Sequence, residues 1–260
     1  MMKVLELDNV SIGYAKKSEA IKNVSLDLSK GDILAIVGES GSGKSTILKS
    51  IMGVLPSGSF ISKGDIRIFG RSINKMSSEE MRVMRGLDVA IVFQDAGTYL
   101  NPKKKIGVQF IETIQNHRTM KKNEAKELAV DMLYKVDLRD PIRIMDSYVF
   151  QLSGGMRQRV AIAMAMVLKP RLLLADEPTS ALDVTIQSDI VKQMLKLRQE
   201  SEMSIIIVTH NIALAANMAD YIAVMKNGEL VEYGKVKSII NEPKNAYTQE
   251  LIGSVFELEG

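Results

Sequence analysis

Cysteine and tryptophan are absent from the 260 residues, and histidine occurs only twice, as His117 and His210. The lack of cysteine excludes disulfides, thiolate metal sites and iron–sulfur clusters. Two histidines are also too few for a histidine-rich metal site. These absences remove thiol-based and histidine-rich metal chemistry from consideration.

An excess of one charge sign and a long apolar run are also missing. Lysine and arginine number 34 against 31 acidic residues, so the net charge is only +3. Nucleic-acid-binding surfaces are usually strongly basic and clustered, so we expect no nucleic-acid partner. No apolar run reaches 18 residues, and the first ten residues lack the apolar stretch of a signal peptide. We therefore expect a cytoplasmic protein that does not cross a membrane by itself.

The remaining composition is that of an ordinary globular protein, with 46% hydrophobic and 25% charged residues. Disordered, collagen-like and coiled-coil classes are thereby excluded. The length suits one large domain, or one domain with an inserted lobe, and is ample for a buried core.

Apolar patterns alternate between strand-like and helix-like along the chain. Residues 4–10 and 23–28 alternate apolar and polar side chains, as half-exposed strands do. Continuous apolar runs predict parallel strands buried on both faces, and they cover residues 33–37, 172–175 and 205–208. Helical periodicity is clearest from Asp183 to Glu200, with Asp183 as the N-cap. The alternation predicts an α/β fold around a mostly parallel sheet.

The middle and the end of the chain differ from this pattern. From Asn101 to Gln151 we find helix-like stretches and no convincing buried strand. We interpret residues 1–260 as one domain in which a helical lobe, about residues 95–155, is inserted into the α/β core. Residues 235–260 are expected to form a C-terminal helical tail.

Residues 38–45, Gly-Glu-Ser-Gly-Ser-Gly-Lys-Ser, match the phosphate-binding pattern G-x-x-x-x-G-K-[ST]. An apolar strand precedes them, and a helix-compatible run follows. Glycines permit the tight loop, and backbone N–H groups and the helix N-terminus attract phosphate. We expect Lys44 to reach the β- and γ-phosphates and the Ser45 hydroxyl to bind Mg²⁺. The predicted nucleotide-binding residues of this loop are Gly38, Ser40, Gly41, Gly43, Lys44, Ser45 and Thr46.

The apolar run 172–175 ends in two carboxylates, Asp176 and Glu177. At the carboxyl end of a parallel strand, Asp176 is placed for a direct or second-shell Mg²⁺ contact beside the phosphate loop. Glu177 is then placed to polarise a water for attack on the γ-phosphate. Two carboxylates at a strand end are weak evidence alone, and they gain weight from the phosphate loop.

Residues 152–159, Leu-Ser-Gly-Gly-Met-Arg-Gln-Arg, precede a further helical pattern. Ser153 is a plausible cap for this helix, and Gly154 and Gly155 leave its N–H groups bare, which makes a second anion-binding helix terminus. The whole string resembles the signature motif of ATP-binding-cassette (ABC) ATPases.

The resemblance extends to further motifs and covers residues 3–256. It implies that Tyr14 stacks on adenine, and that Gln94 senses Mg²⁺ and the membrane partner. It also implies that the loop 180–183 crosses to another subunit and that His210 contacts the γ-phosphate. The fold it implies is a P-loop NTPase core with an antiparallel β subdomain and the inserted helical lobe.

Taken together, the catalytic residues are expected to be Glu177, His210 and Gln94. The metal-binding residues are expected to be Ser45, Gln94 and Asp176, and the expected cofactors are ATP and Mg²⁺.

Within the family, the chain looks most like ATPase subunits of dipeptide, oligopeptide and nickel importers. Three stretches carry this likeness, namely 94–102, 155–159 and Tyr-Thr-Gln-Glu-Leu at 247–251. Two departures weaken this likeness. Asn211 stands where the family commonly has Asp after the histidine that corresponds to His210, and a proline that the family often has is missing near Ala96-Gly97.

In this family, ATP is held between Lys44 of one subunit and the segment 153–155 of another. The resemblance therefore implies a second ABC ATPase, with a heterodimer favoured and a homodimer possible. It also implies two transmembrane permease subunits, an extracytoplasmic solute-binding protein that acts indirectly, and a place at the cytoplasmic face of the membrane. We expect residues 94–102 to dock on the permease. Tyr99 and Leu100 are either exposed apolar contacts of this dock or core residues of the helical lobe.

Other functions use some of the same motifs. An exporter or lipoprotein-release ATPase shares the core motifs and remains the main alternative. A metabolite kinase could use the phosphate loop but has no reason to keep the Ser153 segment. A non-catalytic nucleotide sensor is excluded only if Glu177 and His210 act as expected.

Overall fold

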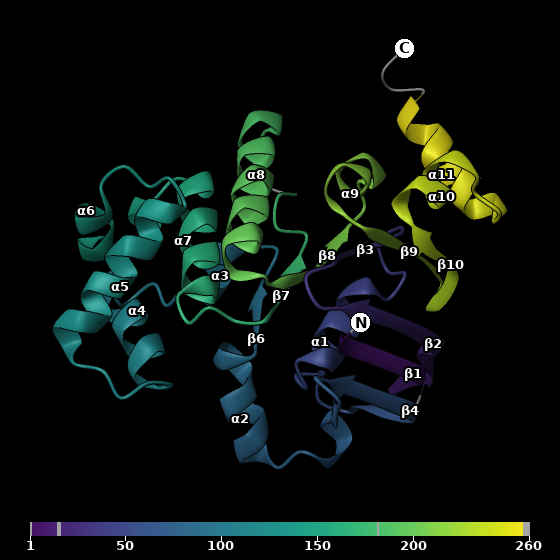
Figure 1. Ribbon diagram of the computed structural model, residues 1–260, viewed down its shortest axis with the longest axis horizontal. Helices are drawn as coiled ribbons and strands as arrows, with labels where there is room; N and C mark the ends of the chain where they lie inside the picture. Colours follow the sequence, from purple (N-terminus) through teal and green to yellow (C-terminus); the bar gives the residue numbers. More distant parts are fainter. Residues whose placement is uncertain (1, 15–16, 181, 257–260) are drawn as a thin grey trace. The chain divides into compact units, whose positions relative to one another are not determined.

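The computed structural model of the chain describes residues 2–14, 17–180 and 182–256. The chain divides into two units, each visible in Figure 1. Unit 1 comprises residues 1–82 and 204–260, and unit 2 comprises residues 83–203. Each unit is described by itself below.

An antiparallel sheet forms the first part of unit 1. Its strand order is β2-β1-β4-β5, with β1 Lys3–Tyr14, β2 Lys17–Ser29, β4 Ser59–Ile68 and β5 Arg71–Ser72. The predicted alternating strands fall inside β1 and β2, and Leu7 and Leu26 form a register pair of buried side chains. The strand β4 was not predicted, because exposed and half-exposed residues fill most of its length and hide its period. The expected antiparallel β part is therefore confirmed.

A parallel group of strands forms the second part of unit 1. Strand β3 Ile33–Val37 lies between β8 Ser204–Thr209 and β9 Tyr221–Lys226 and is parallel to both. Strand β10 Glu229–Lys235 pairs antiparallel with β9. Every residue of β3 and β8 is buried, as the continuous apolar runs predict.

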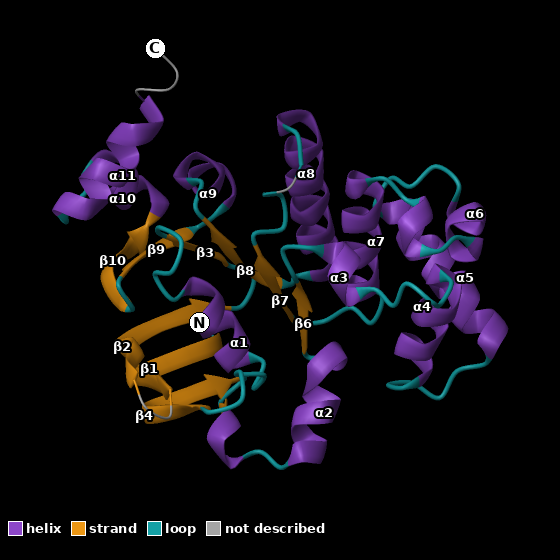
Figure 2. Cartoon of the chain, turned by 180° about the vertical axis from the view of Figure 1, so that it is seen from behind, coloured by secondary structure: helices purple, strands orange, loops and turns teal. Residues whose placement is uncertain are grey.

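Short helices complete unit 1. They are η1 Ile73–Lys75, α1 Lys44–Ile51, α9 Ile212–Met218, α10 Val236–Asn241 and α11 Ala246–Phe256. Helix α1 starts directly after the phosphate loop, and α11 packs against α9. Figure 2 shows α1 beside the sheet of β1, β2 and β4.

Unit 2 contains a parallel strand pair and a group of helices. Strands β6 Val89–Val92 and β7 Leu172–Asp176 are parallel neighbours. The helices that follow β6 are α3 Ala96–Tyr99, α4 Ile106–Gln115, α5 Lys122–Lys135, α6 Pro141–Asp146, η2 Val149–Gln151, α7 Gly154–Met166 and α8 Val184–Ser201. Helix α2, Ser78–Leu87, lies at the boundary of the units and is kinked at Arg85 and Gly86.

Helices α4, α5, α6 and α7 gather in one bundle in Figures 1 and 2. No strand occurs between residues 93 and 171, all of which the structure describes. The ring of Phe110 on α4 is fully buried in this bundle, where α5 packs against both α4 and α7. The helical character of this region agrees with expectation, while the lobe limits of about 95–155 remain a prediction.

Two helix starts were predicted from single residues, and both are confirmed. The Oγ of Ser153 accepts a hydrogen bond from the Met156 N–H at 3.3 Å and so caps α7. The Oδ1 of Asp183 accepts one from the Ile186 N–H at 2.9 Å and caps α8. The start of α7 and the start of α8 are therefore each fixed by a local hydrogen bond.

Among the described residues, no helix combines the length and the apolar character that crossing a bilayer requires.

Candidate active site

The phosphate loop of unit 1 joins the buried strand β3 to helix α1. Lys44, the first residue of α1, is buried, and its Nζ donates to the carbonyl oxygens of Gly38 at 2.8 Å and Glu39 at 2.7 Å. The Ser42 N–H donates to the Glu39 carbonyl at 3.2 Å. The lysine ammonium is therefore held inside its own loop, where a phosphate can compete for it.

Two glycines of this loop have conformations that other residues cannot adopt without strain. Gly38 has a φ of 150°, and a Cβ there would lie 2.1 Å from the Met225 carbonyl oxygen. Gly43 has a φ of 101°, and a Cβ there would lie 2.4 Å from Cδ1 of Ile21. The loop thus approaches strands β9 and β2 at distances that only glycine permits.

The end of the loop is suited to binding an anion. Lys44, Ser45 and Thr46 occupy the first turn of α1, whose N–H groups have no partners within the helix and carry the positive end of its dipole. The buried hydroxyl of Ser42 has no hydrogen-bond partner in the described part of the chain. Backbone donors, a lysine ammonium and an unsatisfied hydroxyl therefore converge on one loop.

Other predicted residues of unit 1 lie on neighbouring segments. Tyr14 ends β1 and pairs with Lys17 at the start of β2, the strand whose Ala20 and Ile21 flank Gly43. His210 is exposed and follows β8 directly. These positions agree with the expected order of the motifs, while the roles of Tyr14 and His210 remain predictions.

The residue after His210 explains one departure from the family pattern. The Oδ1 of Asn211 accepts a hydrogen bond from the Leu214 N–H at 3.0 Å and caps α9. An aspartate makes the same cap, so asparagine preserves the local structure after the histidine.

Unit 2 holds the strand-end carboxylates. Asp176 is the last residue of β7 and is only 8% exposed. Glu177 follows in the left-handed region, with a φ of 43°, which costs a non-glycine residue about 1–2 kcal/mol. Seven other described non-glycine residues, Phe69 and Lys169 among them, also have positive φ, so this conformation alone does not distinguish Glu177.

The amide of Gln94 contacts this second carboxylate. Its Nε2 lies 3.4 Å from Oε2 of Glu177 and 3.2 Å from Oγ of Ser180. The structure therefore brings together two of the three predicted catalytic residues, from the segments that follow β6 and β7. The contact with Ser180 was not predicted, because that residue was assigned only to the loop 180–183. Ala181 of this loop lies outside the described residues.

The start of α7, the helix that follows Ser153, lies next to Gln94. Gly154 and Gln94 line one small cavity of about 90 Å³, together with Pro178 and Leu182. A Cβ on Gly155 would lie 3.2 Å from a methyl group of Ile186, so this glycine lets α7 and α8 pack closely. Ser153 and Gly154 are exposed at this helix terminus, where a ligand can reach them.

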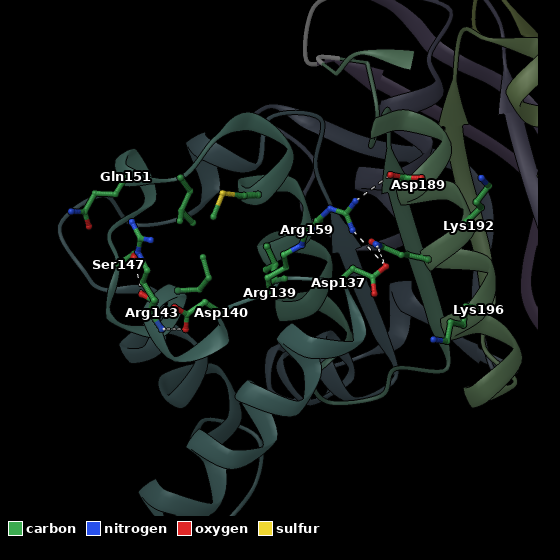
Figure 3. A pocket seen from close by; sticks show the side chains of 15 residues that line it. Asp137, Arg139, Asp140, Arg143, Ser147, Gln151, Arg159, Asp189, Lys192 and Lys196 are labelled. Atoms are coloured by element: carbon green, nitrogen blue, oxygen red, sulfur yellow. Dashed lines mark hydrogen bonds and ion pairs between the residues drawn. The ribbon is translucent and has the colours of Figure 1, made fainter. Parts of the chain in front are cut away.

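Arg159 of the signature string has a structural role instead. Its Nη1 donates to the Val136 carbonyl at 2.9 Å, and the guanidinium lies 3.9 Å from Asp137 and 3.8 Å from Asp189. Figure 3 shows this guanidinium between the two carboxylates, at a cavity of about 890 Å³. None of the predicted nucleotide-binding residues lines this cavity. Arg159 therefore ties α7 to α8 and to the residues that follow α5.

The expected docking segment is corrected in one respect. Tyr99 is 60% exposed and stacks on Phe93 with ring centroids 3.8 Å apart, whereas Leu100 is only 4% exposed. The prediction that Leu100 is an exposed contact is wrong, because its side chain packs into the protein and only Tyr99 faces outward.

A residue that sequence reasoning did not assign to the site also contacts the phosphate loop. The Glu39 N–H donates to the hydroxyl of Tyr247 on α11 at 3.0 Å. Tyr247 was singled out only as part of the subfamily stretch 247–251. No local pattern links it to Glu39, which lies 208 residues away.

A glycine-rich phosphate loop after one buried strand, a carboxylate pair after another and a capped signature helix are the parts of an ATPase cassette. Residues 21–180, more than half of the chain, match the family described as ABC transporter, and the chain belongs to that family. It is an ABC-type ATP hydrolase with the α/β fold of the family's cassettes.

Relatives and solved structures agree with this assignment. The chain is 41% identical to the dipeptide transport ATP-binding protein DppD of Bacillus subtilis, covering 100% of this chain and 78% of the relative. It is 44% identical to the oligopeptide transport ATP-binding protein AmiE of Streptococcus pneumoniae, covering 92% and 68%.

Among solved structures, the chain is similar to the ATP-binding cassette MJ0796 in a dimeric post-hydrolysis state bound to ADP and Pi. The TM-score is 0.79 at 31% identity, and the match covers 89% of this chain and 98% of that one. The cassette cbiO1 of Clostridium perfringens, part of the transporter complex cbiONQ, has a TM-score of 0.80 at 26% identity, covering 99% and 100%.

Proposed function

We propose that this chain is the ATP-hydrolysing subunit of an importer of dipeptides or oligopeptides. The observation that supports it best is the identity of 41–44% with peptide-transport ATP-binding proteins over 92–100% of the chain. Nickel is the second cargo to test, since the sequence resembles nickel importers as well. An exporter or lipoprotein-release system remains the alternative.

Binding begins at the phosphate loop. Lys44 donates to the β- and γ-phosphates of ATP in place of at least one of its two carbonyl partners, because charged phosphates are better partners for an ammonium. The N–H groups of residues 40–46, apart from that of Ser42, which donates to the Glu39 carbonyl, donate to the remaining phosphate oxygens. Tyr14 stacks on adenine. Gly38, Ser40, Gly41, Gly43 and Thr46 serve this step through their backbone and loop conformation.

The residues available for Mg²⁺ are the Ser45 hydroxyl, the Asp176 carboxylate and the Gln94 amide oxygen. All three offer oxygen, which Mg²⁺ requires. The described residues contain no group of three acidic or histidine side chains that would hold a metal alone. The three oxygen ligands from Ser45, Asp176 and Gln94 fit an ion that is bound largely by nucleotide phosphates. When bound, this ion would neutralise charge on those phosphates.

The hydrolytic step is assigned to Glu177 and His210. Glu177 orients and deprotonates the attacking water. The Gln94 amide, 3.4 Å from the Glu177 carboxylate, holds that carboxylate in position. His210 contacts the γ-phosphate.

A second subunit completes the site in this proposal. The terminus of α7, with the exposed Ser153 and Gly154 and the buried Gly155, binds the ATP held by Lys44 of a partner ATPase. We favour a heterodimer with a related ATPase, and a homodimer uses the same contacts. Because ATP then contacts both subunits and its products contact them less well, hydrolysis drives a two-state cycle.

Coupling to transport runs through two separate permease subunits in this proposal, which the likeness to the ATP-binding proteins of peptide transport supports. We place the chain at the cytoplasmic face of the membrane, where Tyr99 docks on the permease. A solute-binding protein outside the membrane delivers the cargo to the permease and does not touch this chain. Gln94 links the dock to Glu177 along one short segment, which supports energetic coupling between them.

Cells that lack this gene test the cargo. Uptake of a radiolabelled dipeptide, a labelled pentapeptide and ⁶³Ni²⁺ is measured with the gene restored as wild type or as Glu177→Gln. We expect wild type alone to restore peptide uptake. Restoration of nickel uptake only would replace peptide with nickel, and restoration of neither would contradict the importer assignment.

A further inference from the structure

We propose that Tyr247 is a positioning residue that anchors the phosphate loop, so that the C-terminal helix α11 sets the affinity for nucleotide. The proposal rests on the assignment of residues 38–45 as the phosphate loop. It gives a function to the Tyr-Thr-Gln-Glu-Leu stretch, which the ATPase mechanism leaves unexplained.

The anchor is a hydrogen bond to the loop backbone. Tyr247 is 5% exposed, and its hydroxyl accepts the Glu39 N–H at 3.0 Å. The carbonyl oxygen of Glu39 accepts a hydrogen bond from the Lys44 ammonium at 2.7 Å. The backbone of Glu39 is therefore held by Tyr247 at its N–H and by Lys44 at its carbonyl.

These two restraints respond differently to a nucleotide. Because its ammonium has three N–H donors, Lys44 must release at least one of the Gly38 and Glu39 carbonyls to contact both the β- and γ-phosphates, and its hold on the start of the loop then weakens. The Tyr247 hydroxyl has no such task, because it lies on the N–H side of Glu39. Its bond can persist and keep the loop in the conformation that receives phosphate.

The tyrosine ring is itself fixed on unit 1. The Nζ of Lys226 lies 4.3 Å from the centre of the ring, a distance suited to a cation–π contact. Lys226 follows Met225, whose carbonyl oxygen approaches Gly38 so closely that only glycine fits there. The same end of β9 thus supports both the loop and the residue that anchors it.

The start of α11 is fixed as well. The Asn245 side-chain oxygen accepts the Tyr247 N–H at 2.9 Å, and the Glu232 carboxylate accepts the N–H groups of Lys244 at 2.8 Å and Asn245 at 3.1 Å. These bonds tie the turn before α11 to strand β10. Because the turn is held, the tyrosine hydroxyl stays at the loop without a large cost in side-chain entropy.

The Tyr247→Phe variant separates an anchor from simple packing, because it keeps the ring and its buried area and removes only the hydroxyl, with its hydrogen bonds to the Glu39 N–H and side chain. ATP binding to the purified chain, with magnesium chloride, is measured by titration for wild type and Tyr247→Phe. We expect the Kd to rise about 3- to 10-fold, the effect of one lost hydrogen bond. In the assembled enzyme, KM should rise by a similar factor while kcat changes much less.

Three further measurements make the result decisive. Hydrogen exchange of the Glu39 amide with ATP bound should be faster in Tyr247→Phe. Lys226→Met removes the cation above the ring and should weaken binding less than Tyr247→Phe. Tyr134→Phe, a conservative change at an exposed tyrosine of α5, should leave the Kd unchanged.

A wild-type Kd and unchanged Glu39 exchange in Tyr247→Phe, with or without a lower melting temperature, would overturn the anchor and leave only a packing role. If Tyr247→Phe fails to fold, Lys226→Met decides the question, and a loss of affinity greater than 10-fold there would contradict a role centred on the hydroxyl. Normal ATP binding by Lys44→Ala would instead disprove the phosphate-loop assignment, independently of Tyr247.

Discussion

The amide nitrogen of Gln94 lies 3.4 Å from a carboxylate oxygen of Glu177 and 3.2 Å from the hydroxyl of Ser180. One side chain at the end of β6 thus contacts two positions of the loop that follows β7. Since Gln94 also begins the segment that leads to Tyr99, a displacement of that segment changes the surroundings of Glu177. This contact is the structural basis for the coupling proposed between the permease and hydrolysis.

Replacing Glu177 with glutamine preserves the shape of the side chain and removes the base. We expect turnover to fall by a factor of about 10²–10⁴, while ATP binding persists because Lys44 is intact. Phosphate release and an ATP titration on the same preparation measure the two effects. Normal turnover of Glu177→Gln in the assembled complex would refute the role of Glu177.

Replacing Gln94 with glutamate places a second carboxylate beside Glu177. Repulsion between two carboxylates this close raises the pKa of one of them. As the pH is lowered, the base therefore becomes protonated and inactive at a higher pH than in the wild type. We therefore expect the acid limb of the kcat profile to move to higher pH. The matched Gln94→Ala variant should lower kcat without moving that limb, and equal profiles for both variants would contradict the contact.

Ser153 has two separable roles, as the cap of α7 and as a contact of the partner's ATP. Ser153→Ala should lose about 0.5–2 kcal/mol of stability, measured by denaturant unfolding. Ser153→Lys should in addition abolish hydrolysis and leave ATP binding at Lys44 of the same chain nearly intact.

The Glu177→Gln chain with its partner ATPase should form ATP-dependent dimers on gel filtration, and Ser153→Lys should prevent them. Hydrolysis at the wild-type rate by Ser153→Lys would exclude the shared site.

Glu232 makes the docking of α11 dependent on pH. Burial acts to raise the pKa of Glu232, but its hydrogen bonds, including those from the Lys244 and Asn245 N–H groups, outweigh burial, and the pKa lies below the ordinary 4.5. The stabilisation is therefore fully present above pH 4.5 and is lost as the pH falls through the folded-state pKa. Melting temperatures of wild type and Glu232→Gln should differ at pH 7 and converge at low pH. A difference that grows toward low pH would contradict this sign.

Much of the fold and of the site could be predicted because the signals are local. A buried strand, a glycine-rich loop and a helix start occur consecutively around Lys44, and the caps at Ser153 and Asp183 need only the next three residues. Strand β4 could not be predicted, because exposed and half-exposed residues hide its period. The burial of Leu100 could not be predicted either, because it depends on which other segments cover that side chain. The Tyr247 contact likewise joins residues 208 positions apart.

The docking prediction changes with the burial of Leu100. Leu100→Asp would place a charge in the protein interior and impair folding, so only Tyr99 is suitable for a test. We expect Tyr99→Asp to leave the melting temperature and basal ATP hydrolysis near wild type and to reduce uptake strongly. Tyr134→Asp, at a similarly exposed tyrosine of α5, serves as the control. Full uptake with Tyr99→Asp, at normal expression, would rule out this dock.

The central claim is that ATP hydrolysis by this chain drives peptide import. It is tested most directly by measuring phosphate release and the uptake of a labelled dipeptide together, in vesicles that contain the chain, its partner ATPase and both permeases. We expect uptake to require ATP, to follow phosphate release in proportion, and to stop in Glu177→Gln together with hydrolysis. Dipeptide uptake that continues in Glu177→Gln vesicles, or vigorous hydrolysis that accompanies no uptake when the solute-binding protein is supplied, would contradict the claim.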